Sequence, residues 1–316
     1  MPPQNREYVS DVWKDNLFSE KVVFCTGGAG TICSAQVRAL VYLGANACIV
    51  GRNVEKTERV ATEIATVRTG ARVLGIGGID VRDSEGLKAA ADRCVEELGG
   101  IDYAIAGAAG NFLASVNNIS SNAFKSVMDI DVLGSYNTVK ATIPHLVKSA
   151  EKHRNEPANP RRKGTGGRII FLSSTTHYIG SPFQTHLAAA KAGVDAMSNN
   201  VALEFGPYGV TANVITPGPI ENTEGVARLV PAGSEAAVRK GQPLGRYGLT
   251  KDIADATVYL LSESGSYVSG HTLVVDGASW RAPGGSLGMG NSLAYPDSLL
   301  SGNAVAGVKG RKEQKL

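Results

Sequence analysis

The chain reads KVVFCTGGAGTICSAQVRALVYLGA over residues 21–45, an apolar run followed by a glycine-rich turn and a segment of helical period. The apolar run, 21–27, is continuous rather than alternating, which indicates a strand buried on both faces. The apolar residues of 34–45 recur at three- and four-residue spacing, which predicts a helix. A strand, a tight turn and a helix in this order are typical of the start of a βαβ unit.

The same alternation continues beyond this unit, and it predicts an α/β fold. We expect a single doubly wound Rossmann-type domain with a parallel seven-stranded sheet over 21–280, between an N-terminal extension (1–20) and a C-terminal tail (281–316). The further strands are predicted at 46–52, 72–80, 100–110, 167–174, 209–218 and 271–277, and the further helices at 54–68, 84–98, 123–147, 186–205 and 252–262.

Composition narrows the function classes. The chain has 316 residues, of which 43% are hydrophobic, so wholesale disorder is excluded. A net charge of +3 is too small to indicate a nucleic-acid partner. The longest apolar runs fall short of the roughly 18 residues of a membrane span, so we expect none. The four cysteines have neither metal-ligand nor disulfide-framework spacing, so we expect no metal and a reducing compartment.

The glycine-rich turn and the ends of the next two strands predict a dinucleotide site. Gly27, Gly28 and Gly30 would let the backbone approach a pyrophosphate that the following helix N-terminus stabilises; an ordinary βα loop is the alternative. Arg52 stands where an acidic residue would bind a ribose 2′-hydroxyl, and it can pair with a 2′-phosphate instead. This favours NADPH over NADH, unless Arg52 is a plain surface residue. Asp80, after the third strand, could accept from the adenine amino group.

Four later segments carry a resemblance to a known family. The segments are AAGNF (108–112), NAFKSVMDIDVLGSYN (122–137), AAAKAGVDAM (188–197) and PGPIENTEG (217–225). Together with the TGxxxG-like start and Lys191, they resemble the short-chain dehydrogenase/reductase family over about residues 20–280. Within that family they look like the peroxisomal 2,4-dienoyl-CoA reductases, particularly the fungal ones. In the family's turn, glycines stand where this chain has Thr31 and Cys33.

The resemblance implies NADPH as the cofactor and a homo-oligomeric assembly. Lys191 would contact the nicotinamide ribose, and residues 217–223 would wrap the carboxamide side. With the residues inferred above from the turn and the strand ends, the expected cofactor-binding residues are Thr26, Gly27, Gly28, Gly30, Thr31, Ile32, Arg52, Asp80, Ala108, Lys191, Pro217, Gly218, Pro219, Ile220 and Thr223.

Two departures from the family pattern fall in the reaction centre. Most members carry a tyrosine four residues before the lysine, and this chain has Leu187, which has no proton to give. The residue that is usually asparagine is Asp131. Reduction of a conjugated thioester needs no phenol at a carbonyl oxygen, because hydride goes to the δ carbon and a proton to the α carbon. We therefore expect an NADPH-dependent 2,4-dienoyl-CoA reductase, an oxidoreductase acting on a CH–CH group in β-oxidation of unsaturated fatty acids.

The proton donor stays open between four residues. Asp131, acting through a water, is the first choice, although burial would have to raise its pKa. His177, Tyr178 and His186 are competing acids. Ser174, thirteen residues before Leu187, could donate to the enolate oxygen or merely satisfy a backbone group at the strand end. A carbonyl reductase that uses Tyr178, or a non-catalytic NADP-binding protein, is the alternative function.

The acyl-CoA substrate has its own predicted contacts. Phe112 and Asn111 would line the acyl pocket, although Phe112 could equally be core. The expected substrate-binding residues are Arg82, Asn111, Phe112, Ser120, Ser121, Asn122 and Arg228, the two arginines meeting coenzyme A phosphates. The tripeptide Gln314-Lys315-Leu316 resembles the peroxisomal address Ser-Lys-Leu, which predicts an import-receptor partner and a peroxisomal location.

Overall fold

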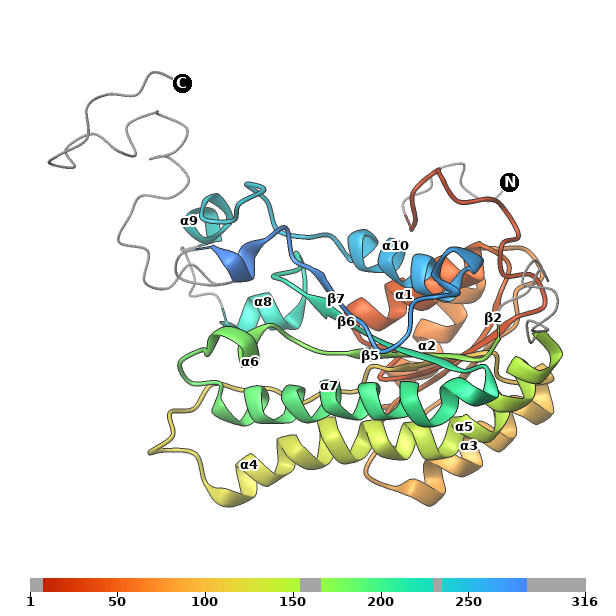
Figure 1. Ribbon diagram of the computed structural model, residues 1–316, viewed down its shortest axis with the longest axis horizontal. Coiled ribbons are helices and arrows are strands. Elements are labelled where there is room, and N and C mark those ends of the chain that lie inside the picture. The colour runs from red at the N-terminus through yellow and green to blue at the C-terminus, as the bar shows by residue number, and fades with distance from the viewer. Residues whose placement is uncertain (1–7, 154–165, 230–234, 283–316) are drawn as a thin grey trace, which may run out of the picture.

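The computed structural model describes residues 8–153, 166–229 and 235–282, which form one seven-stranded sheet (Figure 1). Every strand pair is parallel, and the strand order is β3-β2-β1-β4-β5-β6-β7. The predicted fold is confirmed. The strands are β1 (Val22–Thr26), β2 (Asn46–Val50), β3 (Val73–Ile76), β4 (Tyr103–Ala106), β5 (Arg168–Leu172), β6 (Thr211–Pro217) and β7 (Thr272–Val275).

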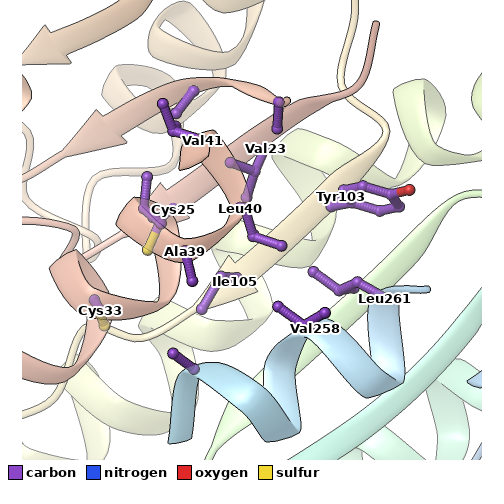
Figure 2. Close-up of a cluster of buried hydrophobic side chains, with 14 of the residues drawn as sticks. Val23, Cys25, Cys33, Ala39, Leu40, Val41, Tyr103, Ile105, Val258 and Leu261 are labelled. Atoms are coloured by element: carbon purple, nitrogen blue, oxygen red, sulfur yellow. The ribbon is translucent and has the colours of Figure 1, made fainter. Parts of the chain in front are cut away.

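Helices cover both faces of this sheet. Val23 and Cys25 of β1 belong to the core beneath α1, α2 and α10, whereas Val22 and Phe24 belong to the core beneath α3, α5 and α7 (Figures 1 and 2). The unbroken apolar run of β1 therefore reflects burial on both sides. The helices are α1 (Thr31–Tyr42), α2 (Val54–Ala65), α3 (Ser84–Leu98), α4 (Ser121–Met128), α5 (Gly134–His153), α6 (Thr176–Ile179), α7 (Thr185–Phe205), α8 (Glu224–Leu229), α9 (Glu235–Lys240) and α10 (Thr250–Leu261).

The helix expected over 123–147 is interrupted. The chain forms α4, then a π-helical turn at Asp129–Leu133, and then α5. Ser120 begins the first piece, because its hydroxyl accepts from the Ala123 N–H at 3.2 Å. A π-turn adds a residue to one turn of helix and is frequent at functional sites. It carries Asp131 here, so the irregularity lies where the reaction centre is predicted.

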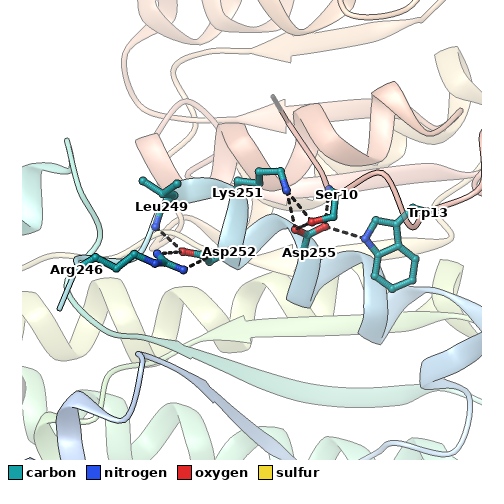
Figure 3. Close-up of polar contacts among 7 residues, drawn as sticks. All are labelled: Ser10, Trp13, Arg246, Leu249, Lys251, Asp252 and Asp255. Atoms are coloured by element: carbon teal, nitrogen blue, oxygen red, sulfur yellow. Dashed lines mark hydrogen bonds and ion pairs between the residues drawn. The ribbon is translucent and has the colours of Figure 1, made fainter. Parts of the chain in front are cut away.

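The described part of the N-terminal extension packs against the domain. Val9 and Phe18 are fully buried in the core beneath α1 and α10. The Ser10 N–H and the Trp13 indole donate to the Asp255 carboxylate on α10 at 2.9 and 2.7 Å (Figure 3). Residues 8–20 therefore act as a strap across α10.

The predicted address tripeptide and the tail from 283 on lie outside the described residues. Within the described ranges, no helix combines the length and the apolar content that crossing a bilayer requires. In the same ranges, no group of three or more histidines, cysteines and carboxylates is arranged to hold a metal ion. The four cysteines are buried free thiols.

Candidate active site

The glycine-rich turn forms a backbone cradle after β1. Gly27 has a φ of +66°, and a Cβ there would lie 2.9 Å from the Ala108 backbone. A Cβ on Gly28 would lie 2.5 Å from the Ile49 side chain. Gly30 precedes α1 and brings no side chain to cap the helix, so the first N–H groups of α1 can bind an anion. Gly27 and Gly28 therefore let the turn pack directly on the ends of β4 and β2, and the uncapped N–H groups that follow fit the pyrophosphate of a dinucleotide.

Cys33 occupies the place of a family glycine, and Gly107 makes room for it. Its thiol donates to the Gly107 carbonyl at 3.6 Å, and a Cβ on Gly107 would overlap the Cys33 sulfur. Gly107 thus supplies the close packing that a glycine at position 33 supplies in the usual turn. Our sequence reasoning missed this residue, although its position directly after a buried strand was a usable signal.

Two arginines, Arg52 and Arg82, act on the Asp80 carboxylate. The Arg82 side chain donates to both carboxylate oxygens at 2.9 and 2.5 Å. This hydrogen bonding, with the Arg52 charge as a smaller contribution, lowers the pKa of Asp80 to about 2. Arg52 and Asp80 line a cavity of about 230 Å³ with Gly27 and Ala108. Arg82, which we expected at coenzyme A phosphates, therefore lies beside the predicted cofactor cavity.

A buried ion pair forms the centre of the site. Asp131 is fully buried, and its Oδ2 lies 3.0 Å from Lys191 Nζ. Its Oδ1 accepts from the Gly110 N–H at 2.7 Å. Lys191 Nζ also donates to the Leu172 carbonyl at 3.0 Å. Asp131 and Lys191 thus join four parts of the fold: the π-turn, the loop after β4, the end of β5 and α7.

Leu187 and Ser174 lie where their sequence positions predict. Leu187 is buried on α7, one turn before Lys191. Ser174 follows β5, and its Oγ accepts from the Thr176 N–H at 3.4 Å, which is the backbone role left open for it. Ser174 also lines an apolar cavity of about 200 Å³. Predicted cofactor residues share that cavity: Ile32, Pro217, Gly218, Pro219, Ile220 and Thr223.

Tyr178 is directed at Asp195 on α7. Its hydroxyl donates to Asp195 Oδ2, and the His177 ring lies 3.0 Å from the same oxygen. Burial, and then the contact with Asp195, raise the pKa of Tyr178 to about 12. Asp195 is eight residues beyond Leu187, or about 12 Å along the helix axis. The phenol thus contacts α7 two turns away from the place that the family's tyrosine would occupy.

His186 lies on the inner side of the loop after β4. Its ring is fully buried, stacks on the Phe112 ring at 4.3 Å, and its Nε2 lies 2.9 Å from the Phe112 carbonyl. Gln184, which sequence reasoning missed, donates to the same carbonyl at 3.0 Å. Phe112 is half-buried and follows Gly110 by two residues. Its backbone therefore belongs to the same short strip, residues 110–112, whose Gly110 N–H contacts Asp131.

The remaining predicted substrate residues lie at the start of α4, on α8 and in the loop after β4. Ser120 caps α4, and Ser121 and Asn122 are its exposed first residues. Asn111 is half-buried beside Phe112. Arg228 belongs to α8, but its side chain lies outside the described part of the chain. Figure 1 shows α4, α6 and α8 gathered at one end of the molecule, beyond the carboxyl ends of the strands, where doubly wound folds bind ligands.

Known proteins resemble this chain over most of its length. The peroxisomal 2,4-dienoyl-CoA reductase of Saccharomyces cerevisiae, described as (3E)-enoyl-CoA-producing, is 47% identical over 91% of this chain and 92% of the yeast protein. A peroxisomal 2,4-dienoyl-CoA reductase of Rattus norvegicus is 36% identical over 84% of this chain and 85% of its own.

Solved structures and a family model agree with these relatives. A short-chain type dehydrogenase/reductase from Mycobacterium marinum has a TM-score of 0.72 at 29% identity, covering 82% of this chain and 95% of its own. A short chain dehydrogenase from Bacillus anthracis has a TM-score of 0.68 at 31% identity, covering 82% and 96%. The family model described as enoyl-(acyl carrier protein) reductase matches residues 27–278. The chain therefore belongs to the short-chain dehydrogenase/reductase family.

Proposed function

We propose that this chain is a 2,4-dienoyl-CoA reductase that uses NADPH and releases 3-enoyl-CoA, in the β-oxidation of unsaturated fatty acids. A nicotinamide cofactor follows from the family, and the printed activities of its relatives support the substrate. One structural observation carries the proposal: buried Leu187 replaces the family's phenol, while one turn away Lys191 pairs with a buried carboxylate.

The chain's own residues account for the demands of the reaction. Bound NADPH supplies the hydride that reaches the δ carbon. Electron density then moves through the conjugated system to the thioester oxygen, where Ser174 donates a hydrogen bond. A water held by Asp131 delivers the proton to the α carbon. The Lys191 ammonium, 3.0 Å from the Asp131 carboxylate, replaces that proton through Asp131, and Lys191 also binds the nicotinamide ribose.

Different residues bind the cofactor and the acyl-CoA substrate. Gly27, Gly28 and the first turn of α1 hold the pyrophosphate, and Arg52 holds the 2′-phosphate. Phe112 and Asn111, next to the strip that contacts Asp131, line the acyl pocket. The domain limits remain 21–280, with residues 8–20 as a strap.

The test follows the loss of dienoyl absorbance and the oxidation of NADPH when purified protein meets 2,4-hexadienoyl-CoA. A simple ketone serves as the control substrate. We expect turnover of the thioester alone, and none with Lys191→Ala. Turnover of the ketone alone would make the chain a carbonyl reductase with Tyr178 as its acid. Binding of NADPH without turnover of either would make it a non-catalytic NADP-binding protein.

We further propose a peroxisomal location and a homo-oligomeric state. The relatives' printed names support the first, and the half-exposed Leu133 and Tyr136 side chains support the second. An import receptor would bind Gln314-Lys315-Leu316. A fluorescent protein fused to the N-terminus should become punctate with peroxisomal markers and diffuse when the tripeptide is deleted. Sedimentation of the purified protein reads the oligomeric state, and a monomer would refute that part.

A further inference from the structure

The backbone carbonyl of Phe112 is held by two buried side chains at once. His186 Nε2 lies 2.9 Å from it and Gln184 Nε2 lies 3.0 Å from it. The two residues are 0% and 1% exposed. A carbonyl oxygen has two lone pairs, so both are occupied. The stacking of the Phe112 and His186 rings, 13° from parallel, fixes the same loop through its side chain.

A second pair of contacts joins the same two segments. The Ala114 N–H donates to the Phe183 carbonyl at 3.1 Å, and Gln184 Nε2 also donates to that carbonyl at 3.2 Å. Phe183 has a φ of +66°, a left-handed conformation that is strained for an aromatic residue. Residues 112–114 and 183–186 therefore form a clasp, defined by these contacts, and the clasp holds a strained turn before α7.

The clasp is two residues away from the reaction centre. Gly110 donates its N–H to Asp131 Oδ1, and Gly110 and Phe112 are separated by one residue. Asp131 in turn contacts Lys191, which lies on the same helix as His186. A shift of the Phe112 carbonyl would move the Gly110 N–H, because so short a strip has few torsions to absorb it.

The partners of His186 also define what its ring can do. Since Nε2 faces a carbonyl, that nitrogen carries the proton and Nδ1 is an acceptor. Neither His186 Nδ1 nor Gln184 Oε1 meets a hydrogen-bond partner among the described residues. The one proton on the ring is thus engaged by the Phe112 carbonyl.

We propose that His186 and Gln184 are positioning residues, which hold the strip 110–112 so that the Gly110 N–H fixes Asp131 in its productive place. The inference rests on the proposed function and reassigns His186 from a candidate acid to a support for the acid. Misplacement of a catalytic group by about 1 Å can cost about 100-fold in rate. The clasp therefore governs kcat more than cofactor affinity.

The test compares His186→Phe, which keeps the stacked ring and loses the donor, with His186→Gln, which restores a donor near the Nε2 position. We expect His186→Phe to lower kcat about 10-fold or more and His186→Gln to recover most of it. Titration of NADPH fluorescence should give unchanged affinity in both. His271→Phe, at an exposed histidine, is the matched control and should match the unmodified protein. Equal kcat in the two His186 variants would overturn the proposal.

A double-mutant cycle separates positioning from general loss of structure. If His186 acts through Asp131, His186→Phe should cost little rate in an Asp131→Asn background. An equal cost in both backgrounds would refute the coupling. Amide hydrogen exchange of the peptide that spans 108–114 reports on the clasp independently of enzymatic activity. The exchange should become faster in His186→Phe. If the unmodified protein reduces no dienoyl-CoA, the proposed function fails, whereas unchanged exchange refutes the clasp alone.

Discussion

Asp131 combines full burial with two charge-stabilising contacts. The Lys191 ammonium lies 3.0 Å away, and the Gly110 N–H lies 2.7 Å away. Removing one partner of a buried ion pair leaves the other uncompensated, which is strongly unfavourable. A substitution of Asp131 can therefore lower the rate by removing the reacting group or by disturbing the buried ion pair. Kinetics and cofactor binding distinguish these two effects.

Replacing Asp131 by asparagine keeps the shape and removes the ionisable group. If Asp131 delivers the proton, kcat should fall about 10²- to 10⁴-fold. Steady-state kinetics with 2,4-hexadienoyl-CoA measure this, and NADPH binding checks that the cofactor site survives. A rate near that of the unmodified protein would move the acid role to Tyr178.

The contribution of Asp80 to stability should depend on pH. Its pKa is lowered to about 2 in the folded chain, against about 3.9 for an unperturbed aspartate. A depressed folded pKa stabilises the fold above the unfolded pKa, and this contribution is lost as pH falls from about 4 toward 2. The advantage in melting temperature of the unmodified protein over Asp80→Asn should therefore shrink between pH 6 and pH 3. A constant or growing difference would contradict the Arg82 pairing.

At this scale, sequence reasoning placed some residues well and others poorly. Leu187 and Lys191 could be paired because four residues make one helical turn. Arg82 could not be placed, because its bidentate contact with Asp80 depends on the local backbone after β3. Gln184 gave no signal, since its partner lies 72 residues earlier in the chain.

Among the elements, α10 is held by more than its own helical bonds. Asp255 accepts from Ser10 and Trp13, and Lys251 donates to the Ser10 hydroxyl at 2.6 Å (Figure 3). Burial raises the pKa of Asp255, but hydrogen bonds from Ser10 and Trp13 outweigh it and leave the pKa below its ordinary value. The strap thus joins the chain's beginning to a helix near its end.

Asp255→Asn should loosen the strap. The amide cannot accept as many hydrogen bonds, so we expect the free energy of unfolding to fall by about 1–3 kcal/mol. Urea denaturation measures the change, and limited proteolysis near Trp13 should become faster. Asp92→Asn, at an exposed helical pair with Lys88, should change neither. Equal effects in the two variants would contradict the role of the strap.

Most long elements could be predicted from periodicity, whereas the short helices α6, α8 and α9 were not. The interruption of the helix expected over 123–147 has a physical cause. The apolar spacing over 123–147 indicates one helix, and α4 and α5 do cover most of that range. Apolar spacing does not reveal the π-turn between them, because one wider turn shifts the spacing of the apolar residues by only one position. Tertiary contacts of Asp131 accompany it, and those contacts are not local.

For the whole molecule, the sheet could be predicted because its central strands, such as β1 and β4, are continuous apolar runs that are buried on both faces. Continuous strands alternating with helices leave few topologies other than a doubly wound sheet. The cleft follows from that topology, since parallel strands end at one edge. What the pattern could not supply is the set of contacts between loops, such as the clasp, which depend on the finished packing.

Cofactor preference affects the stability of the whole fold, because a ligand that binds only the native state stabilises all of it. At 100 times its Kd, NADPH should stabilise the protein by about 2.7 kcal/mol, a rise in melting temperature of about 5 °C or more. The same concentration of NADH should raise it less. Arg52→Ala should remove the difference, whereas Arg59→Ala, at an exposed site on α2, should preserve it. Equal shifts with both cofactors in the unmodified protein would refute the role of Arg52.

The fit of Cys33 against Gly107 has an evolutionary consequence. The gap between the start of α1 and the end of β4 has room for one small group, and either position can provide it. Substitutions at these two sites should therefore covary among homologues, with bulk at one compensated by its loss at the other. A homologue that has glycine at the first site would lose the shortest contact of a Cβ at the second site, where the Thr26 carbonyl oxygen, 3.0 Å away, would still confine the new side chain.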